Sequence, residues 1–278
     1  MKRVAFWARW LLVTIGIVVL SSITVDATLG GGGLSQSALG ILATSVSQKV
    51  ETGCPPGTME MQGGEKRVCV DVYEASPESS CPASVVHSVN DTRANMTSAC
   101  APASQKDAHP WTFVTQNQAQ ELCARAGKRL LSNEEWYRAS LGTPDGVVPP
   151  RCNTHIHSAQ NTGASPECVS GSGHYDMVGN VWEWVDGQVE NNIYRDRTLP
   201  ESGYVTEADS EGVVMQTGEQ PSFDYHDDYF FTTGSGAFGM LRGGFYGSEA
   251  DAGLYTIQAK TAPSFAGDAV GFRCARDL

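Results

Sequence analysis

Apolar residues recur with a period of two in the segment 53–75. Two runs of alternating apolar positions flank the pair Gly63-Gly64: Met59, Met61, Val68, Val70 and Val72. Alternation of this kind predicts half-buried strands, because successive side chains of a strand point to opposite faces. Two adjacent glycines between such runs favour a tight turn. The pattern therefore predicts a β-hairpin.

The apolar period changes to that of a helix after residue 115. One helical face is formed by apolar residues at the spacing i, i+3, i+4 and i+7: Ala119, Leu122, Cys123 and Ala126. Thr115 and Gln118 are spaced as in a capping box, which predicts the start of the helix. Gly127 follows as a residue that tolerates the left-handed conformation at a helix end.

A second helix is predicted directly after the first. Ser132 and Glu135 again have the spacing of a capping box, and Gly142 marks the end. Two well-capped amphipathic helices of this kind could occur in any α+β protein.

The pattern is weaker in the rest of the chain. Residues 76–110 and 143–175 are rich in turn residues and are interpreted as loops, and residues 186–240 show no regular period. Asp224-Tyr-His-Asp-Asp228 is a cluster of carboxylates within the last of these segments. We interpret the cluster as a solvated loop rather than as a cation site.

The N-terminal segment has the pattern of an export signal. Basic residues precede an uncharged apolar run, Trp10–Val25, and Val25-Asp26-Ala27 fits a cleavage site. The run is shorter than the roughly 20 apolar residues of a spanning helix. We predict a signal peptide over residues 1–27, with an uncleaved anchor as the alternative, and a flexible linker over residues 28–52. Residues 53–278 are then the folded domain.

Charge and cysteine content narrow the class of protein. The formal net charge is −12, which argues against nucleic acid as a partner and against an anionic membrane surface. All eight cysteines follow the export segment, so we predict four disulfides and a secreted, periplasmic or otherwise extracytoplasmic location. Sequence alone allows about a hundred pairings. Our preferred set is Cys54–Cys69, Cys81–Cys100 and Cys152–Cys168, which close short local loops, together with Cys123–Cys274, which would tie an early helix to the end of the chain.

Three motifs in the C-terminal half belong together. They are Asp176-Met-Val-Gly-Asn-Val-Trp-Glu-Trp184, Arg242-Gly-Gly-Phe-Tyr-Gly-Ser-Glu-Ala-Asp-Ala-Gly253 and Gly271-Phe-Arg-Cys-Ala-Arg-Asp277. With the paired-helix segment 123–136, they resemble the formylglycine-generating enzyme (sulfatase-modifying factor) family. The resemblance covers roughly residues 53–277. It implies that family's variant of the C-type lectin fold, which has little regular secondary structure and is stapled by disulfides.

The resemblance also implies a pairing, a metal site and structural roles. Relatives join a helix cysteine to the cysteine of the terminal motif, which supports Cys123–Cys274. Matching positions bind a structural calcium ion through the side chains of Asp176 and Glu183 and the carbonyls of Gly179 and Val181. Hard oxygen ligands of this kind suit calcium. We further expect Gly243-Gly244 to permit close backbone approach, Phe272 to lie in the core, and Arg273 to bond buried carboxylate or backbone groups.

The reactive group of the family is absent from its expected positions. Relatives oxidise a substrate cysteine with oxygen and a copper ion held by two thiolates, and those two cysteine positions are occupied here by Ser248 and Gly253. A hydroxyl and a hydrogen cannot replace the soft ligands of Cu(I), so copper is not expected. Glu249 and Asp251 flank the emptied positions and are weak candidates for an acid and a base.

Two functional hypotheses follow from these residues. The first is an exported module without the cysteine and copper reaction, which binds a peptide, protein or glycan. The second is a formylglycine-generating-type oxidase, or a relative with altered oxidative chemistry. A membrane is a partner only if the N-terminal segment stays as an anchor.

Overall fold

The computed structural model describes residues 53–278 of the protein. The helices are α3 (Val89–Asn95), α4 (Gln116–Arg125) and α5 (Asn133–Ser140), with short 3-10 turns η2 (Phe223–Tyr225) and η3 (Glu249–Asp251). The strands are β1 (Thr58–Gln62), β2 (Arg67–Asp71), β3 (Ala75–Pro77), β4 (Pro102–Ser104), β5 (Arg129–Leu130), β6 (Trp182–Glu190), β7 (Ile193–Tyr194), β8 (Arg197–Thr198), β9 (Gly203–Ala208), β10 (Val214–Gly218), β11 (Tyr229–Thr232), β12 (Ala237–Arg242), β13 (Ile257–Thr261), β14 (Val270–Phe272) and β15 (Cys274–Asp277).

Strand β6 lies between two hydrophobic cores, because its side chains alternate between its faces. Trp182 and Trp184 pack in the core that contains α4 residues such as Leu122. Val185 packs in the other core, with Trp136 of α5. Both helices contact β6. Strand β6, which begins at Trp182 within the Asp176–Trp184 motif, is thus packed against a core on each of its faces.

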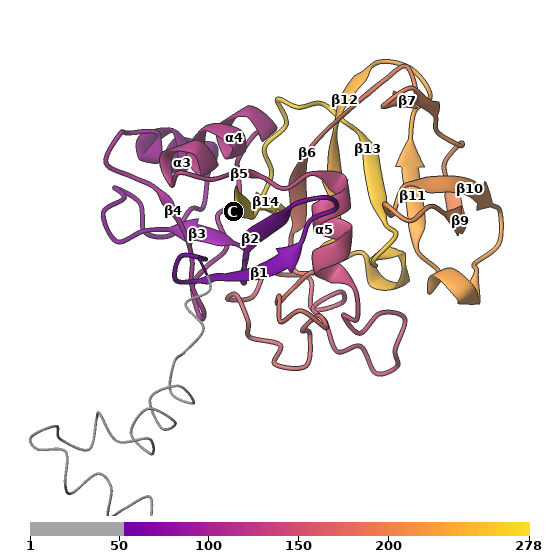
Figure 1. The fold of residues 1–278 in the computed structure, drawn as a ribbon, viewed down its shortest axis with the longest axis horizontal. Coiled ribbons are helices and arrows are strands. Elements are labelled where there is room, and N and C mark those ends of the chain that lie inside the picture. The colour runs from indigo at the N-terminus through magenta and orange to yellow at the C-terminus, as the bar shows by residue number, and fades with distance from the viewer. Residues whose placement is uncertain (1–52) are drawn as a thin grey trace, which may run out of the picture. The chain divides into compact units, whose positions relative to one another are not determined.

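The large sheet has the strand order β10-β9-β11-β13-β12-β6-β7-β8, and β14 pairs with β6 in parallel. Most of its neighbouring strands are antiparallel, but β11 and β13 run parallel. Strands β9, β10 and β11 lie at the end of the domain away from the three helices (Figure 1). The end of the sheet formed by β9, β10 and β11 therefore extends beyond the helices.

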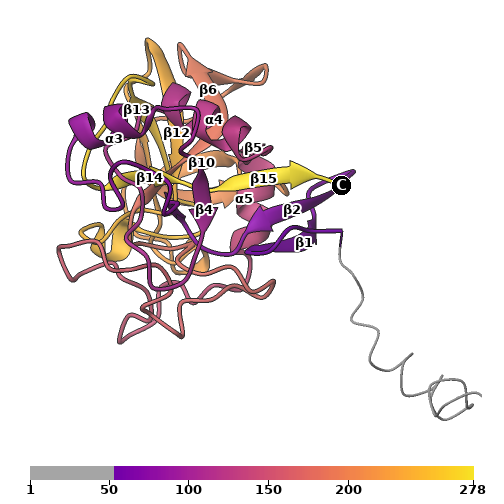
Figure 2. The same ribbon diagram turned by 90° about the vertical axis from the view of Figure 1, so that its left-hand side faces the viewer.

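A smaller sheet joins the two ends of the described chain, in the order β1-β2-β15-β5 (Figure 2). Strand β15 inserts between β2 and β5, and Cys274 at its start is bonded to Cys123 of α4. This bond closes a separation of 151 residues. In the loop-entropy account, closure of so long a loop stabilises the fold by about 5 kcal/mol.

All four predicted disulfides are confirmed: Cys54–Cys69, Cys81–Cys100, Cys123–Cys274 and Cys152–Cys168. The predicted hairpin is β1–β2, whose register pairs Gln62 with Arg67. Both capping boxes are formed, at Thr115 and at Ser132. Gly127 has φ +67°, as the predicted left-handed helix end requires.

Three interpretations of weakly patterned segments need correction. Residues 76–110 are not only a loop, because they contain α3 and pair β3 with β4. Residues 186–240 contain most strands of the large sheet. These strands are short or interrupted by bulges, so the apolar residues along them show no clear period of two. Asp228 is fully buried and not solvated. The predicted signal peptide and linker lie outside the described residues, and within residues 53–278 no helix is long and apolar enough to cross a membrane.

Candidate functional site

Arg242 begins the motif with the two empty cysteine positions, and it is a buried structural group. Its guanidinium donates to the carbonyls of Gly212 (3.1 Å) and Leu254 (2.7 Å) and lies 4.8 Å from the ring centroid of Trp136. Burial lowers the pKa of Arg242 to about 10. The arginine therefore ties the end of β12 to the far part of the following loop, at Leu254, and to the β9–β10 turn, at Gly212.

Gly243 and Gly244 allow the close approach that the sequence predicts. Their φ values are +86° and +84°, a region that disfavours residues with a side chain. A Cβ on Gly243 would lie 2.7 Å from the carbonyl oxygen of Met177, and one on Gly244 would lie 2.5 Å from Cβ of Ala252. The turn is therefore packed against the Asp176–Trp184 motif on one side and against its own loop on the other.

Ser248, at the first cysteine position, has its hydroxyl engaged in the turn. The Oγ atom accepts from the backbone N–H of Phe245 at 3.0 Å, and the Ser248 N–H donates to the Phe245 carbonyl at 3.0 Å. The side chain is half-buried and precedes η3. Ser248 thus stabilises the local turn in the position where relatives carry a reactive sulfur.

Gly253, at the second cysteine position, leaves no room for any side chain. An ideal Cβ on Gly253 would lie 1.7 Å from Oδ1 and 2.4 Å from Cγ of Asp228. Asp228 is held there because its Oδ2 accepts from the N–H of Tyr255 at 2.6 Å. A buried carboxyl group therefore fills the volume that a thiol at position 253 would need.

A second buried acid, Asp145, lies on the other side of the same loop. Its Oδ2 accepts from the N–H of Leu254 at 2.9 Å. Burial raises the pKa of Asp145 to about 7, and burial together with the charge of Asp145 raises the pKa of Asp228 well above its usual range. Within residues 53–278, Oδ1 of each acid has no hydrogen-bond partner. The backbone N–H groups of Leu254 and Tyr255 are thus each bonded to a buried acid. Both acids keep their protons to a higher pH than an exposed carboxyl does.

An open hollow of about 380 Å³ adjoins this loop. Asp145, Glu249 and Ala252 contribute to its wall, with His155 and His226 among the other polar groups. Of the two weak acid–base candidates, Glu249 is exposed beside the hollow and Asp251 is half-buried within η3. Burial and the charge of Glu249 raise the pKa of Asp251. The structure therefore places these two carboxyls near one another but gives neither a partner that would orient it for catalysis.

No thiolate is present in this region. All eight cysteines of the chain fall within the described residues, and each is in one of the four disulfides. Cys152 lines the hollow but is bonded to Cys168. The folded chain therefore lacks the pair of free thiolates that Cu(I) prefers.

Glu183, a predicted calcium ligand, forms a buried ion pair. Both carboxylate oxygens accept from Arg273, the shortest contact being 2.5 Å, and Oε2 also accepts from Nε1 of Trp136 at 2.7 Å. Arg273 also donates to the carbonyls of Asp71, Val72 and Tyr175, which confirms its predicted role. Phe272 is fully buried, again as predicted.

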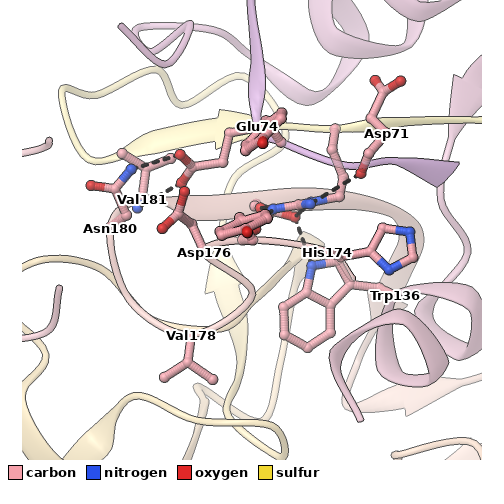
Figure 3. A network of polar contacts seen from close by, with 12 residues as sticks. Asp71, Glu74, Trp136, His174, Asp176, Val178, Asn180 and Val181 are labelled. Atoms are coloured by element: carbon pink, nitrogen blue, oxygen red, sulfur yellow. Dashed lines mark hydrogen bonds and ion pairs between the residues drawn. The ribbon is translucent and has the colours of Figure 1, made fainter. Parts of the chain in front are cut away.

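The other predicted ligands lie nearby, around the buried Glu74 (Figure 3). Glu74 accepts from the side chain of Asn180 at 2.6 Å and from the N–H of Val181 at 3.2 Å. Asp176 accepts from the N–H of Gly163 at 2.6 Å, and burial raises its pKa to about 6. Burial and the charge of Asp176 raise the pKa of Glu74 well above its usual range. The motif is therefore held in place at two points. Asn180 and Val181 donate to Glu74, in the connection between β2 and β3, and Asp176 accepts from Gly163.

Two of these residues already have close protein neighbours in the folded chain. The Glu183 carboxylate faces a guanidinium, and a Cβ at Gly179 would lie 2.3 Å from the Asn153 carbonyl oxygen, so this turn is tightly packed. No group of three or more His, Cys, Asp or Glu side chains in residues 53–278 is placed to hold a metal. Calcium binding stays a prediction, which elemental analysis of the dialysed protein tests: about one ion per chain would require Glu183 to leave Arg273.

Sequence reasoning missed three buried carboxyls that organise the site: Glu74, Asp145 and Asp228. Each accepts a hydrogen bond from a residue distant in sequence, at separations of 107, 109 and 27 residues. Asp228 carried a signal, because it ends the acidic cluster and precedes the apolar strand β11. The sequence around Glu74 and Asp145 carried no signal that a search for periodicity could detect.

The fold and site together define an α+β domain stapled by disulfides, with an Arg-Gly-Gly loop and a buried Arg–Glu pair. The family described as "Sulfatase-modifying factor enzyme 1-like domain" matches residues 59–278. The chain belongs to this family. The predicted fold class, an α+β domain of the formylglycine-generating-enzyme type, is confirmed by this match.

Several known proteins are similar to this chain. Inactive C-alpha-formylglycine-generating enzyme 2 of Bos taurus is 30% identical over 153 residues, which cover 46% of this chain and 50% of that protein. Formylglycine-generating enzyme of Streptomyces coelicolor is 28% identical over 196 residues, covering 61% and 53%. The chain thus spans about half the length of these curated relatives. Among solved structures, the Major Tropism Determinant P3c variant has a TM-score of 0.46 at 15% identity, covering 80% of this chain and 53% of that one.

Proposed function

We propose that this protein is an exported binding module that lacks the thiol-dependent copper oxidation of its family. The observation that carries the proposal is the contact of 1.7 Å between an ideal Cβ at Gly253 and Oδ1 of Asp228. The second thiol is absent, and the volume that it would need is occupied by a buried acid. A single Gly-to-Cys change could not restore the site without displacement of Asp228.

Two further observations support the proposal. The Ser248 hydroxyl accepts a turn hydrogen bond at 3.0 Å and is a hard oxygen where a soft ligand is needed. All cysteines are in disulfides, so no other thiolate can substitute. The same four disulfides, together with the N-terminal signal pattern, support an extracytoplasmic location. One of the similar proteins is itself described as inactive.

The test is an oxidation assay on the purified full chain. The protein is incubated with copper, oxygen and a cysteine-containing sulfatase peptide, and aldehyde is measured by mass spectrometry. Formylglycine-generating enzyme of Streptomyces coelicolor serves as the positive control on the same peptide. We expect no aldehyde above the reaction without protein, and no free thiol in a native thiol titration. Aldehyde that depends on the protein, and that persists in Ser248→Ala, would refute the proposal.

A further inference from the structure

The large sheet carries a continuous band of aromatic rings, called here the aromatic band. Its members come from β9, β11, the start of β6 and the loop after β12: Tyr204, Tyr229, Phe231, Trp182, Phe245 and Tyr246. Successive ring centroids lie 5.1, 4.6, 6.3, 6.4 and 5.0 Å apart in that order. Separations in this range are those of interacting aromatic pairs. The rings of the band are therefore in continuous contact and are not isolated from one another.

The band is accessible because the sheet extends beyond the helices. Trp182, under the α4 side, is nearly buried, whereas Tyr204, Tyr229 and Phe231 farther along the sheet are half-exposed. Tyr229 and Phe231 share one face of β11, and the intervening Phe230 is fully buried in the core on the opposite face. Phe230 thus belongs to the core, Phe231 packs partly buried against the second core, and Tyr229 belongs to neither core.

One end of the band forms a cage of aromatic and acidic groups. A hollow of about 550 Å³ lies against Tyr204 and Tyr229, whose rings are at 80° to one another, with Glu201 and Glu219 at its edge. Both glutamates are exposed, and neither forms an ion pair within residues 53–278. Gly218 is paired with Tyr204 in the sheet and lines the hollow, where its missing side chain leaves space.

This arrangement suits a cationic side chain. Aromatic faces attract ammonium and guanidinium groups, and arginine in particular stacks on rings. Lys260 already places its ammonium 4.6 Å from the ring centroid of Phe231, in the middle of the band. The unpaired glutamates of the cage and the net charge of −12 both favour a positively charged partner.

The other end of the band suits the main chain and apolar side chains of the same partner. A second hollow of about 470 Å³ is lined by Trp182 and Phe245, and Gln258 and Asp268 supply polar groups there. Aromatic grooves with a few polar groups bind extended, proline-rich segments. At roughly 3.3 Å per residue, the band could contact on the order of six to eight extended residues.

We propose that the aromatic band binds an extended polypeptide segment whose arginine or lysine side chain enters the hollow beside Tyr204 and Tyr229, near Glu201 and Glu219. This inference rests on the proposed binding function and names its partner class. The cage lies on strands β9, β10 and β11 and does not use the two emptied cysteine positions. A neutral glycan would gain the stacking but would not use the unpaired glutamates.

The test is titration calorimetry on the full chain with two synthetic peptides. Both are about ten residues of alternating proline and alanine, with either arginine or norleucine at the centre. We expect the arginine peptide to bind at least about tenfold more tightly than the norleucine peptide. Tyr204→Ala and Gly218→Leu, which remove a cage wall and fill the hollow, should each weaken the arginine peptide by about tenfold or more. The double variant Glu201→Gln, Glu219→Gln should remove the difference between the peptides.

Matched controls keep the outcome interpretable. Glu65→Gln changes one exposed charge on the β1–β2 turn, and Phe223→Ala removes a ring that is 93% exposed outside the band; both should bind as the unchanged chain does. Equal binding of the two peptides, or no binding of either, overturns the inference. Neutral-oligosaccharide binding that Tyr204→Ala abolishes would also overturn it. The aldehyde assay on the same preparations reports separately on the proposed loss of oxidation.

Discussion

Substitution of Gly253 by alanine is the sharpest probe of the emptied site. The added Cβ would lie 1.7 Å from Oδ1 and 2.4 Å from Cγ of Asp228, whereas ordinary contacts are 3.4–4 Å. The backbone of Gly253 is not in the left-handed region, so alanine brings no conformational strain there. The cost of the substitution is therefore steric, and it comes from a single neighbour.

The magnitude follows from what Asp228 must give up. Insertion of a methyl group into a packed interior typically costs about 1–3 kcal/mol. Movement of Asp228 also breaks its 2.6 Å bond from the Tyr255 N–H and leaves a buried amide unpaired, which costs about 1–3 kcal/mol. We expect Gly253→Ala to lower the free energy of unfolding by on the order of 3 kcal/mol.

Urea denaturation without reductant measures this loss. Ser248→Cys, a nearly isosteric change in the same loop, is the matched control and should cost less than about 1 kcal/mol. Asp228→Ala removes the clashing atoms, so the double variant should be more stable than the sum of the single losses by more than about 1 kcal/mol. A Gly253→Ala protein within about 0.5 kcal/mol of the unchanged chain, with additive double-variant losses, would refute the reasoning.

Three other predictions concern stability. Arg273→Met should lower the free energy of unfolding by about 3–5 kcal/mol in urea denaturation, because it leaves the Glu183 carboxylate buried without its cation; a loss below about 1 kcal/mol would contradict this. Because the folded pKa of Asp145, about 7, lies above the unfolded value of 3.8, its carboxyl holds more protons in the folded state between these values. The unchanged chain should therefore gain stability relative to Asp145→Asn as pH falls from 7 towards 4, by up to about 1.4 kcal/mol per pH unit, and a flat difference between the two denaturation series would contradict this. Replacement of Cys123 and Cys274 by alanine should cost about 5 kcal/mol in urea, more than the roughly 3 kcal/mol for any one of the three short-loop disulfides, and an equal loss would show that loop length does not set the effect.

Local features of the chain were predictable because short-range interactions determine them. The capping boxes at Thr115 and Ser132 need only residues three positions apart, and both are formed. The β1–β2 hairpin depends on alternation around one glycine pair. The region 186–240 was not predictable in this way, since its strands have bulges and pair with partners distant in sequence.

Sequence by itself determined the family of this protein, its even number of cysteines, and the absence of cysteine at positions 248 and 253. These are matters of residue identity, of motifs and of short spacing. Only the tertiary structure decided what occupies the empty position, because Asp228 reaches Gly253 from another part of the chain. It also decided that Glu183 faces Arg273, 90 residues away. The aromatic band likewise joins rings from separate strands, because a sheet places side by side residues whose positions along the chain are unrelated.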